Sequence, residues 1–176
     1  MNPGASTIRC ESRLPIARSL PEVWEYMCDV ARWPEWAPTV RRSWVREGTP
    51  LTPGAHVEQR AKLPFGFTRY RAQVVTVVEP PRSLAFAGPM GTSTARWGME
   101  FDSIADGRTE AEMWVEVDLS NVMRTIPKRV FKDRIQGVMD IEMAAIKVAV
   151  ENVTPGLAQI PAKDTRPNNV HSRSTP

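Results

Sequence analysis

The chain contains few of the residues from which metal sites and disulfide frameworks are built. Its 176 residues include two cysteines and two histidines. Of the two histidines, only His56 lies outside the C-terminal tail. No Cys/His or carboxylate cluster has metal-ligand spacing, so the sequence predicts no metal and no cofactor. The turns GPMG and FGF do not precede a helix as a phosphate loop would, and no serine lies in a strand-to-helix elbow. Nucleotide-dependent and triad enzymes are therefore not expected.

Long hydrophobic runs are also missing. The longest apolar stretch, MAAIKVAV at 143–150, is interrupted by Lys147 and is too short to cross a bilayer. The start, MNPGAS, has no basic region followed by an apolar run, so we expect no signal peptide and a cytoplasmic protein. Without a secretion signal, Cys10 and Cys28 are expected to be reduced.

The positive charge is not concentrated on the predicted domain. The formal net charge is +3, and the segment after Asn152 supplies +2 of it through Lys163, Arg166 and Arg173 against Asp164. The rest of the chain is therefore near +1, with acidic and basic residues interspersed. That distribution lacks the basic patch of a nucleic-acid-binding protein, so no nucleic-acid partner is expected.

Patterning divides the chain into three parts. Residues 1–6 are expected to be flexible, residues 7–152 to fold as one domain, and the Pro- and Asn-rich residues 153–176 to be disordered. Alternating side chains predict a first strand over 8–16, and Ser19, Pro21 and Glu22 predict a capped helix start. RWPEWAP predicts a second, shorter helix that carries Trp33 and Trp36 on one face. Strand patterns separated by turn residues then occupy 39–46, 55–62, 67–78, 83–88, 92–102 and 108–119.

A long helix is predicted over 127–152, because no proline occurs between Pro127 and Pro155. A rotation of 100° per residue gathers one apolar arc that we expect to face the sheet. Its members are Phe131, Ile135, Val138, Ile141, Ala145, Val148 and Ala149. The charged residues Arg134 and Glu142 fall within this arc, about 12 Å apart along the axis.

One strand, two short helices, six antiparallel strands and a long helix make an α+β helix-grip order. The segments IARSLPEVWEYMCDVARWPEWAPTVRR and VVEPPRSLAF, the PG before the third strand and the long last helix resemble the START-like (SRPBCC) superfamily, in its polyketide cyclase/dehydrase branch. The resemblance spans about residues 8–151 and implies a seven-stranded antiparallel sheet wrapped around the long helix, with an internal cavity. It also implies that Trp33 lines the cavity while Trp36 packs beneath or beside it. The alternative is that both are only core residues.

Alternation and the resemblance together predict the residues that face the cavity. The strands contribute Val57, Gln59, Gln73, Val75, Val77, Leu84, Phe86, Ser93, Trp97, Met99, Met113 and Val115, and the helix contributes Phe131, Ile135 and Val138. The strand over 67–78 fits either of two registers, and a slip by one residue would exchange Arg71 and Gln73 for Tyr70 and Ala72. Large Trp and Met side chains could instead fill the interior.

Glu142 is the candidate for chemistry, because the matching position in aromatase/cyclases of this branch faces the cavity. A carboxyl group in an apolar pocket has a raised pKa, which suits a general base. Arg134 or Arg71 could then stabilise a developing enolate oxygen. The alternative is an ordinary ion pair of Glu142 at the edge of the helix. Aromatase/cyclases of the branch also carry an arginine where this chain has Val77, which leaves other cyclisations, dehydrations or plain binding open.

Three functions follow. The first is a cavity protein that binds a hydrophobic, oxygenated small molecule such as a polyketide intermediate and acts on it as a cyclase or dehydratase. The second is a non-catalytic carrier or sensor of lipids, whose polar pocket residues would pair with each other. The third is a protein-interaction module that uses exposed Trp44 and Trp114 and the basic tail. No stable membrane insertion is expected, and a homodimer is compatible with the sequence.

Overall fold

The computed structural model describes residues 6–46, 48, 50–62, 68–90, 92–119 and 127–153. The predicted flexible N-terminus, apart from Ser6, and the predicted disordered tail, apart from Val153, lie outside these residues. Both therefore stay predictions.

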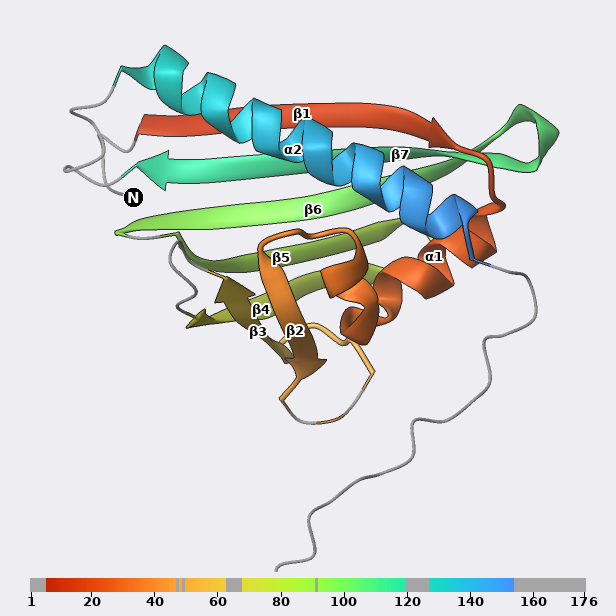
Figure 1. Cartoon of the computed structure of the whole chain (residues 1–176), viewed down its shortest axis with the longest axis horizontal. Coiled ribbons are helices and arrows are strands. Elements are labelled where there is room, and N and C mark those ends of the chain that lie inside the picture. The colour runs from red at the N-terminus through yellow and green to blue at the C-terminus, as the bar shows by residue number, and fades with distance from the viewer. Residues whose placement is uncertain are drawn as a thin grey trace, which may run out of the picture.

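Seven strands form one antiparallel sheet in the order β1-β7-β6-β5-β4-β3-β2, and α2 crosses one face of it (Figure 1). The strands are β1 (Ser6–Ile16), β2 (Val40–Val45), β3 (His56–Lys62), β4 (Thr68–Glu79), β5 (Ser83–Met90), β6 (Ser93–Ile104) and β7 (Arg108–Leu119). The short helix η3 (Ala105–Gly107) joins β6 to β7. Because each strand after β2 pairs with its neighbour in the chain, the short predicted turns suffice to connect them. The predicted α+β helix-grip fold is confirmed.

The two short helices lie between β1 and β2. Helix α1 (Leu20–Cys28) begins at the predicted cap, where the Ser19 backbone N–H donates to Glu22 Oε2 over 2.9 Å. The 3-10 helix η1 (Val30–Glu35) follows at once, and Ser43 Oγ on β2 donates a hydrogen bond to the Val30 carbonyl. This contact fixes η1 against β2, the edge strand at the opposite side of the sheet from β1.

The long helix α2 (Lys128–Glu151) packs chiefly against β1, but not on the face that the sequence pattern suggested. Its buried residues are Met139, Met143, Ile146 and Val150. Three residues of the predicted arc are exposed, Val138 by 49%, Ile141 by 62% and Val148 by 58%, whereas Phe131, Ile135, Ala145 and Ala149 are partly buried against the core. The prediction was therefore right for four of its seven residues, and the centre of the buried face lies roughly one residue of rotation, or about 100°, from the predicted one.

Polar contacts with β1 account for this rotation. Gln136 Nε2 donates to the Glu11 carbonyl over 2.9 Å, and Ser12 Oγ donates to Asp140 Oδ1 over 2.8 Å. Further along, Lys147 Nζ donates to the Pro15 carbonyl. These groups share one flank of α2, so they turn the methionines toward the sheet and the predicted arc partly toward solvent.

In the first half of β4, the register is the predicted one that turns Arg71 and Gln73 inward. Arg71 pairs with Gln59, and Gln73 pairs with Val57. Paired residues point to the same face of a sheet, so Arg71 and Gln73 share the inner face with Gln59 and Val57.

A bulge changes the facing of β4 further along. The register shifts between Val75 and Val77, after which Val77 pairs with Ala85 and Val78 pairs with Leu84. Val78, not Val77, packs against the core. The prediction that Val77 points inward was therefore wrong, because the extra residue of a bulge turns the following side chain to the other face.

On the outer face of the sheet, Trp114 of β7 lies directly over Gly98 of β6. A Cβ atom on Gly98 would lie 2.6 Å from Trp114 Cζ2 and 2.9 Å from the Leu84 carbonyl oxygen. Gly98→Ala should therefore lower the free energy of unfolding by about 1–3 kcal/mol, the usual cost of overpacking. Chemical denaturation checks this, with Thr94→Ala on the exposed side of the same strand as the control. Equal stability of the two variants would show that Trp114 moves aside without cost.

Candidate functional site

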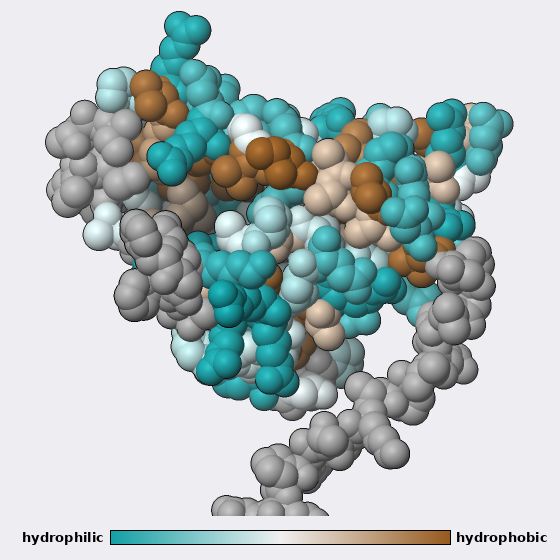
Figure 2. All heavy atoms as spheres, in the orientation of Figure 1, coloured by the Kyte–Doolittle hydropathy of each residue, from teal (hydrophilic) through white to brown (hydrophobic). Residues whose placement is uncertain are grey.

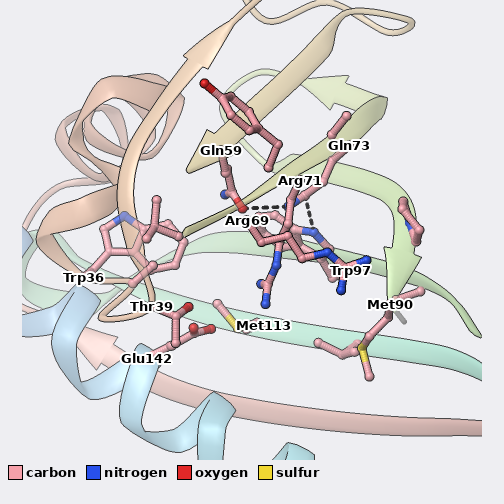
Figure 3. Close-up of a pocket in the computed structure, with 18 residues that line it drawn as sticks. Trp36, Thr39, Gln59, Arg69, Arg71, Gln73, Met90, Trp97, Met113 and Glu142 are labelled. Atoms are coloured by element: carbon pink, nitrogen blue, oxygen red, sulfur yellow. Dashed lines mark hydrogen bonds between the residues drawn. The ribbon is translucent and has the colours of Figure 1, made fainter. Parts of the chain in front are cut away.

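A cavity of about 360 Å³ lies between the inner face of the sheet, η1 and α2 (Figure 3). Strands β3 to β7, the segment from η1 to β2, and α2 all contribute to its wall. The lining residues are Trp36, Ala37, Thr39, Val40, Gln59, Arg69, Tyr70, Arg71, Ala72, Gln73, Gly88, Pro89, Met90, Ala95, Trp97, Met113, Val115 and Glu142. Its volume falls in the range of sites for small organic molecules.

The structure brings together part of the predicted site. Seven of the predicted residues line the cavity: Gln59, Arg71, Gln73, Trp97, Met113, Val115 and Glu142. Seven others are buried in the core without lining it: Trp33, Val57, Val75, Leu84, Phe86, Ser93 and Met99. The rest lie elsewhere, with Val77 beyond the bulge, Phe131 and Ile135 packed on the core, and Val138 and Arg134 exposed on α2.

Trp33 of η1 and Trp36, which directly follows this helix, have the opposite roles from those expected. Trp36 lines the cavity, while Trp33 is 1% exposed and its indole N–H donates to the Met27 carbonyl over 3.1 Å. Trp33 packs edge-on against Phe86 and Trp97, at centroid distances of 5.2 and 5.6 Å. It is thus the base on which the cavity-lining Trp97 rests. The indole Nε1 of Trp36 is buried and has no hydrogen-bond partner among the described residues.

A chain of hydrogen bonds fixes the amides of the cavity wall. Trp97 Nε1 donates to Gln73 Oε1 over 2.7 Å, and Gln73 Nε2 donates to Gln59 Oε1 over 3.2 Å (dashed in Figure 3). An indole can only donate, so Gln73 must turn its oxygen to Trp97 and its nitrogen to Gln59. The chain then ends in Gln59 Nε2, which donates to no acceptor in the described part of the protein. As far as the described residues go, this amide donor is available to a ligand in the cavity.

Glu142 is the acidic group of the cavity. Burial disfavours its charged form and raises its pKa to about 7, although the positive charge of Arg71 acts in the opposite direction. Figure 3 shows Glu142 rising from α2 toward the strands that carry Arg71 and Arg69. Within the residues that the structure describes, no group donates a hydrogen bond to the Glu142 carboxyl, and Arg71 acts on it through its charge alone. The ordinary ion pair considered for Glu142 is absent there, so near neutral pH the group can give or accept a proton.

Several lining residues were missed, and two of them left a signal. Arg69 stands two residues before Arg71 on β4, and Ala95 lies between Ser93 and Trp97 in the alternation of β6. Both follow from the period of two once the register is known. Thr39 and Trp36 lie where η1 gives way to β2, and no periodic pattern marks that segment.

Other chemistries find no support in the described ranges. No group of three or more His, Cys, Asp or Glu residues there could hold a metal ion, and both cysteines are free thiols. No helix among these residues is long and apolar enough to cross a membrane.

A model of the family described as polyketide cyclase / dehydrase and lipid transport matches residues 7–151. The chain belongs to that family. No curated protein matches it in sequence. The family and the fold together support a START-like protein that binds a hydrophobic ligand.

Three solved structures show how widely this fold is shared. A START superfamily protein from Mycobacterium smegmatis aligns with a TM-score of 0.67 and 13% identity, over 83% of this chain and 99% of that one. Protein of unknown function SA2116 from Staphylococcus aureus aligns with a TM-score of 0.69 and 12% identity, over 85% and 97%. Ara h 8.0201 aligns with a TM-score of 0.64 and 16% identity, over 82% and 98%. At these identities the likeness shows the fold alone.

The raised pKa of Glu142 predicts a pH-dependent cost to stability. The folded protein keeps this proton up to pH about 7, whereas the unfolded chain releases it near the ordinary value of 4.5. Stability linked to Glu142 therefore falls as the pH rises from 4.5 to about 7. Glu142→Gln should match the wild type below this window and exceed it above, by at most about 3 kcal/mol. Denaturant titrations of both proteins across pH measure the difference, and a constant difference would show that Glu142 titrates normally.

The influence of Arg71 on Glu142 can be measured separately. Arg71→Met removes the positive charge that lowers the Glu142 pKa, so that pKa should rise further. Carboxyl-carbon NMR titration reads the pKa directly. Arg69→Met is the matched control, since it removes the same charge from the same strand and should give a smaller rise. An equal rise in both variants would contradict a specific influence of Arg71.

Proposed function

We propose that the cavity binds a hydrophobic, oxygenated small molecule of polyketide type, and that Glu142 catalyses its cyclisation or dehydration by general acid/base chemistry. One observation carries the proposal. Glu142 lines the cavity with a pKa of about 7, and no group in the described part of the chain donates a hydrogen bond to it. A carboxyl group in that state is suited to proton transfer near neutral pH.

The rest of the wall fits such a ligand. Met90, Met113, Val115 and the Trp97 ring supply apolar surface, and polar side chains on β3, β4 and α2 share the same wall. Donors without a hydrogen-bond partner among the described residues include Trp36 Nε1, Gln59 Nε2 and the guanidinium groups of Arg69 and Arg71. Donors of this kind match carbonyl or acidic oxygens spaced along an apolar molecule.

In the proposed cyclisation, the Glu142 carboxylate removes a proton from a carbon between two ketones. The electron pair of the broken C–H bond moves onto a carbonyl oxygen, and the Arg71 guanidinium stabilises the enolate. The enolate carbon then attacks a second carbonyl carbon and forms the ring bond. That carbonyl oxygen takes the proton back from Glu142, which restores the carboxylate. Subsequent loss of water would give the dehydrated ring.

Arg71 takes this role instead of Arg134. Arg134 is exposed on α2 and does not line the cavity, whereas Arg71 is on its wall and its charge acts on Glu142. The arginine that branch members carry at the position of Val77 has no counterpart on the inner face, because the bulge turns Val77 away. Aromatic first-ring closure as in those members is therefore not part of the proposal.

A non-catalytic carrier is the second candidate, and the amide chain favours it. Trp97 donates to Gln73 and Gln73 donates to Gln59, which is the internal pairing expected of a pocket that only holds its ligand. The same wall leaves Glu142 and Arg71 without hydrogen-bond partners among the described residues, which favours chemistry.

The interaction module has less support. Trp44 and Trp114 are both half-buried, since Trp44 packs edge-on against Tyr70 and Trp114 covers Gly98. Neither presents a free aromatic surface of the kind that this function was expected to need.

The test is a single-turnover assay with a linear polyketone. Product analysis measures turnover, and quenching of tryptophan fluorescence measures binding. Glu142→Gln should bind the probe as the wild type does but form product at least about a hundredfold more slowly, because the base is missing. The wild-type rate should rise with pH to a plateau above about 7, where Glu142 is ionised. Glu25→Gln, on the exposed side of α1, is the control.

Unchanged product formation in Glu142→Gln would refute the mechanism. If the wild type binds the probe at every pH and never alters it, the carrier function is correct.

A further inference from the structure

The cavity opens at the end of the sheet where β3 ends and β4 begins. Of its lining residues, Arg69, Arg71 and Pro89 are exposed, so they lie at the mouth. Gln59, in contrast, is only 5% exposed and lies deeper in the wall. Figure 3 shows Arg69 and Arg71 extending from β4 into the space between the sheet and α2. The wall therefore combines a buried amide with two guanidinium groups near the opening.

The position of Arg69 is set by its partners in the sheet. Arg69 pairs with Ala61 of β3, which pairs in turn with Val40 of β2. Ala61 and Val40 are buried, so Arg69 projects from the inner face of the sheet, where the core lies. Arg71 pairs with Gln59 and lies two residues further into the cavity, about 7 Å along the strand. The two arginines thus mark an outer and an inner point of the same wall.

The strands beside the mouth carry an excess of positive charge, although the domain as a whole is near +1. Residues 40–71 contain seven Arg and Lys residues against Glu47 and Glu58, a net charge of +5. Residues 72–152 contain nine basic and twelve acidic residues, a net charge of −3. Figure 2 shows hydrophilic side chains gathered over β2, β3 and β4, below α2. A field of this sign draws acidic molecules toward the mouth.

Arg69 lacks the acidic partner that arginines elsewhere in the sheet have. On the outer face, Arg13 pairs with Glu112 and Arg96 pairs with Glu116, each on the neighbouring strand. Arg69 has no hydrogen-bond or ion-pair partner among the described residues. Its guanidinium group is therefore available to a molecule that enters the cavity.

The chain offers no acid at the mouth that would take this place. Segments 63–67 and 120–126, which follow β3 and β7, contain no Asp or Glu. The acidic group of the cavity wall is Glu142, and of the two arginines only Arg71 influences its pKa. Arg71 is thus associated with Glu142, and Arg69 remains a second cation at the opening of the cavity.

We propose that the ligand of this cavity is an apolar carboxylic acid and that Arg69 binds its carboxylate at the mouth. A guanidinium group holds a carboxylate through two parallel N–H···O bonds, which a neutral ester does not match. With Glu142 ionised, the wall carries two positive charges and one negative charge, so a single carboxylate balances it. This assignment rests on the proposed function, since the same cavity holds the ligand, and it narrows that ligand to an acid.

Binding at Arg69 also orients the ligand. The apolar body would lie along Met113 and the Trp97 ring. A carbonyl group about 7 Å from the carboxylate would then reach Arg71 and Glu142. The carboxylate thereby selects which carbonyl group is enolised, because it fixes the ligand relative to the base. Arg69 is a binding residue in this account and takes no part in the bond changes.

The test compares decanoate with methyl decanoate, which differ in charge and hardly in shape. Neither has a carbon between two carbonyl groups, so Glu142 cannot turn either over and tryptophan fluorescence measures binding alone. The wild type should bind decanoate at least about tenfold more tightly than the ester. Arg69→Gln should lose that preference, with decanoate weakened at least about tenfold and the ester unchanged. Unchanged ester binding also shows that the variant folds.

Arg41→Gln is the matched control. Arg41 is exposed on β2 beside the lining residue Val40 but does not line the cavity itself. The variant loses the same charge from the same end of the sheet, so it separates a direct contact from the general field. Its affinity for both probes should stay within about twofold of the wild type, because salt screens an exposed charge.

Several outcomes would overturn the assignment of Arg69. These are no detectable binding of decanoate, equal binding of acid and ester by the wild type, or equal weakening of decanoate in Arg41→Gln and Arg69→Gln. Decyl phosphate that binds more tightly than decanoate and depends on Arg69 would assign the mouth to a phosphate instead.

The proposed function fails separately from the acid site. A protein that binds decanoate through Arg69 and leaves the linear polyketone unaltered keeps the acid site and refutes the catalysis. A protein that cyclises the polyketone without preferring decanoate to its ester does the reverse.

Discussion

Four hydrogen bonds along β1 determine which side of α2 faces the cavity. Besides the contacts of Gln136, Asp140 and Lys147, the Ala17 N–H donates to Glu151 Oε1 over 2.7 Å. Each such bond near the surface contributes only about 1 kcal/mol. They can still decide the rotation, because α2 is apolar on more than one side. Turning the helix by about 100° would bury one set of apolar side chains and expose another of similar size. Burial of a large apolar side chain contributes about 1.5–3 kcal/mol, so the gain and the loss would nearly cancel.

The same rotation determines which side of α2 is buried, which borders the cavity and which is exposed. Met139, Met143, Ile146 and Val150 fill the core, and Glu142 lies at the edge of that face, where the cavity begins. One residue earlier, Ile141 points to solvent. A carboxyl group held at this boundary loses much of its hydration without gaining a hydrogen bond from the described residues, which is why its pKa is about 7. The stability lost by ionising Glu142 is consistent with a group that serves function more than folding.

Much of the fold could be predicted from the sequence, because its strands alternate clearly and its turns have distinct chemistry. The pairing of neighbouring strands from β2 to β7 and the cap at Ser19 rest on local signals. The bulge that turns Val77 outward has no such signal, since YRAQVVTVV alternates acceptably in either register. Strict alternation therefore predicted the wrong facing for Val77 in the second half of the strand.

The errors in the candidate site have related causes. The helical wheel placed Glu142 correctly because it lies between the predicted arc and the true one, but it also turned Val138 and Arg134 toward the sheet. Hydropathy alone could not choose between arcs of similar composition, and the β1 contacts that decide are long-range. The predicted roles of Trp33 and Trp36 were interchanged because the two residues lie at different depths in the domain. One helical turn separates Trp33, which packs edge-on against Phe86, from Trp36 at the cavity wall, and spacing alone does not reveal depth.

The most direct test of the account is mass spectrometry of the organic extract from protein purified from its native host. The comparison is with Ala95→Phe, which fills part of the cavity from β6. The account predicts that an apolar molecule with carbonyl or acidic oxygens is recovered from the wild type and is depleted in the variant. Equal recovery from both proteins, or a molecule without oxygens to match Gln59, Arg71 and Glu142, would contradict it.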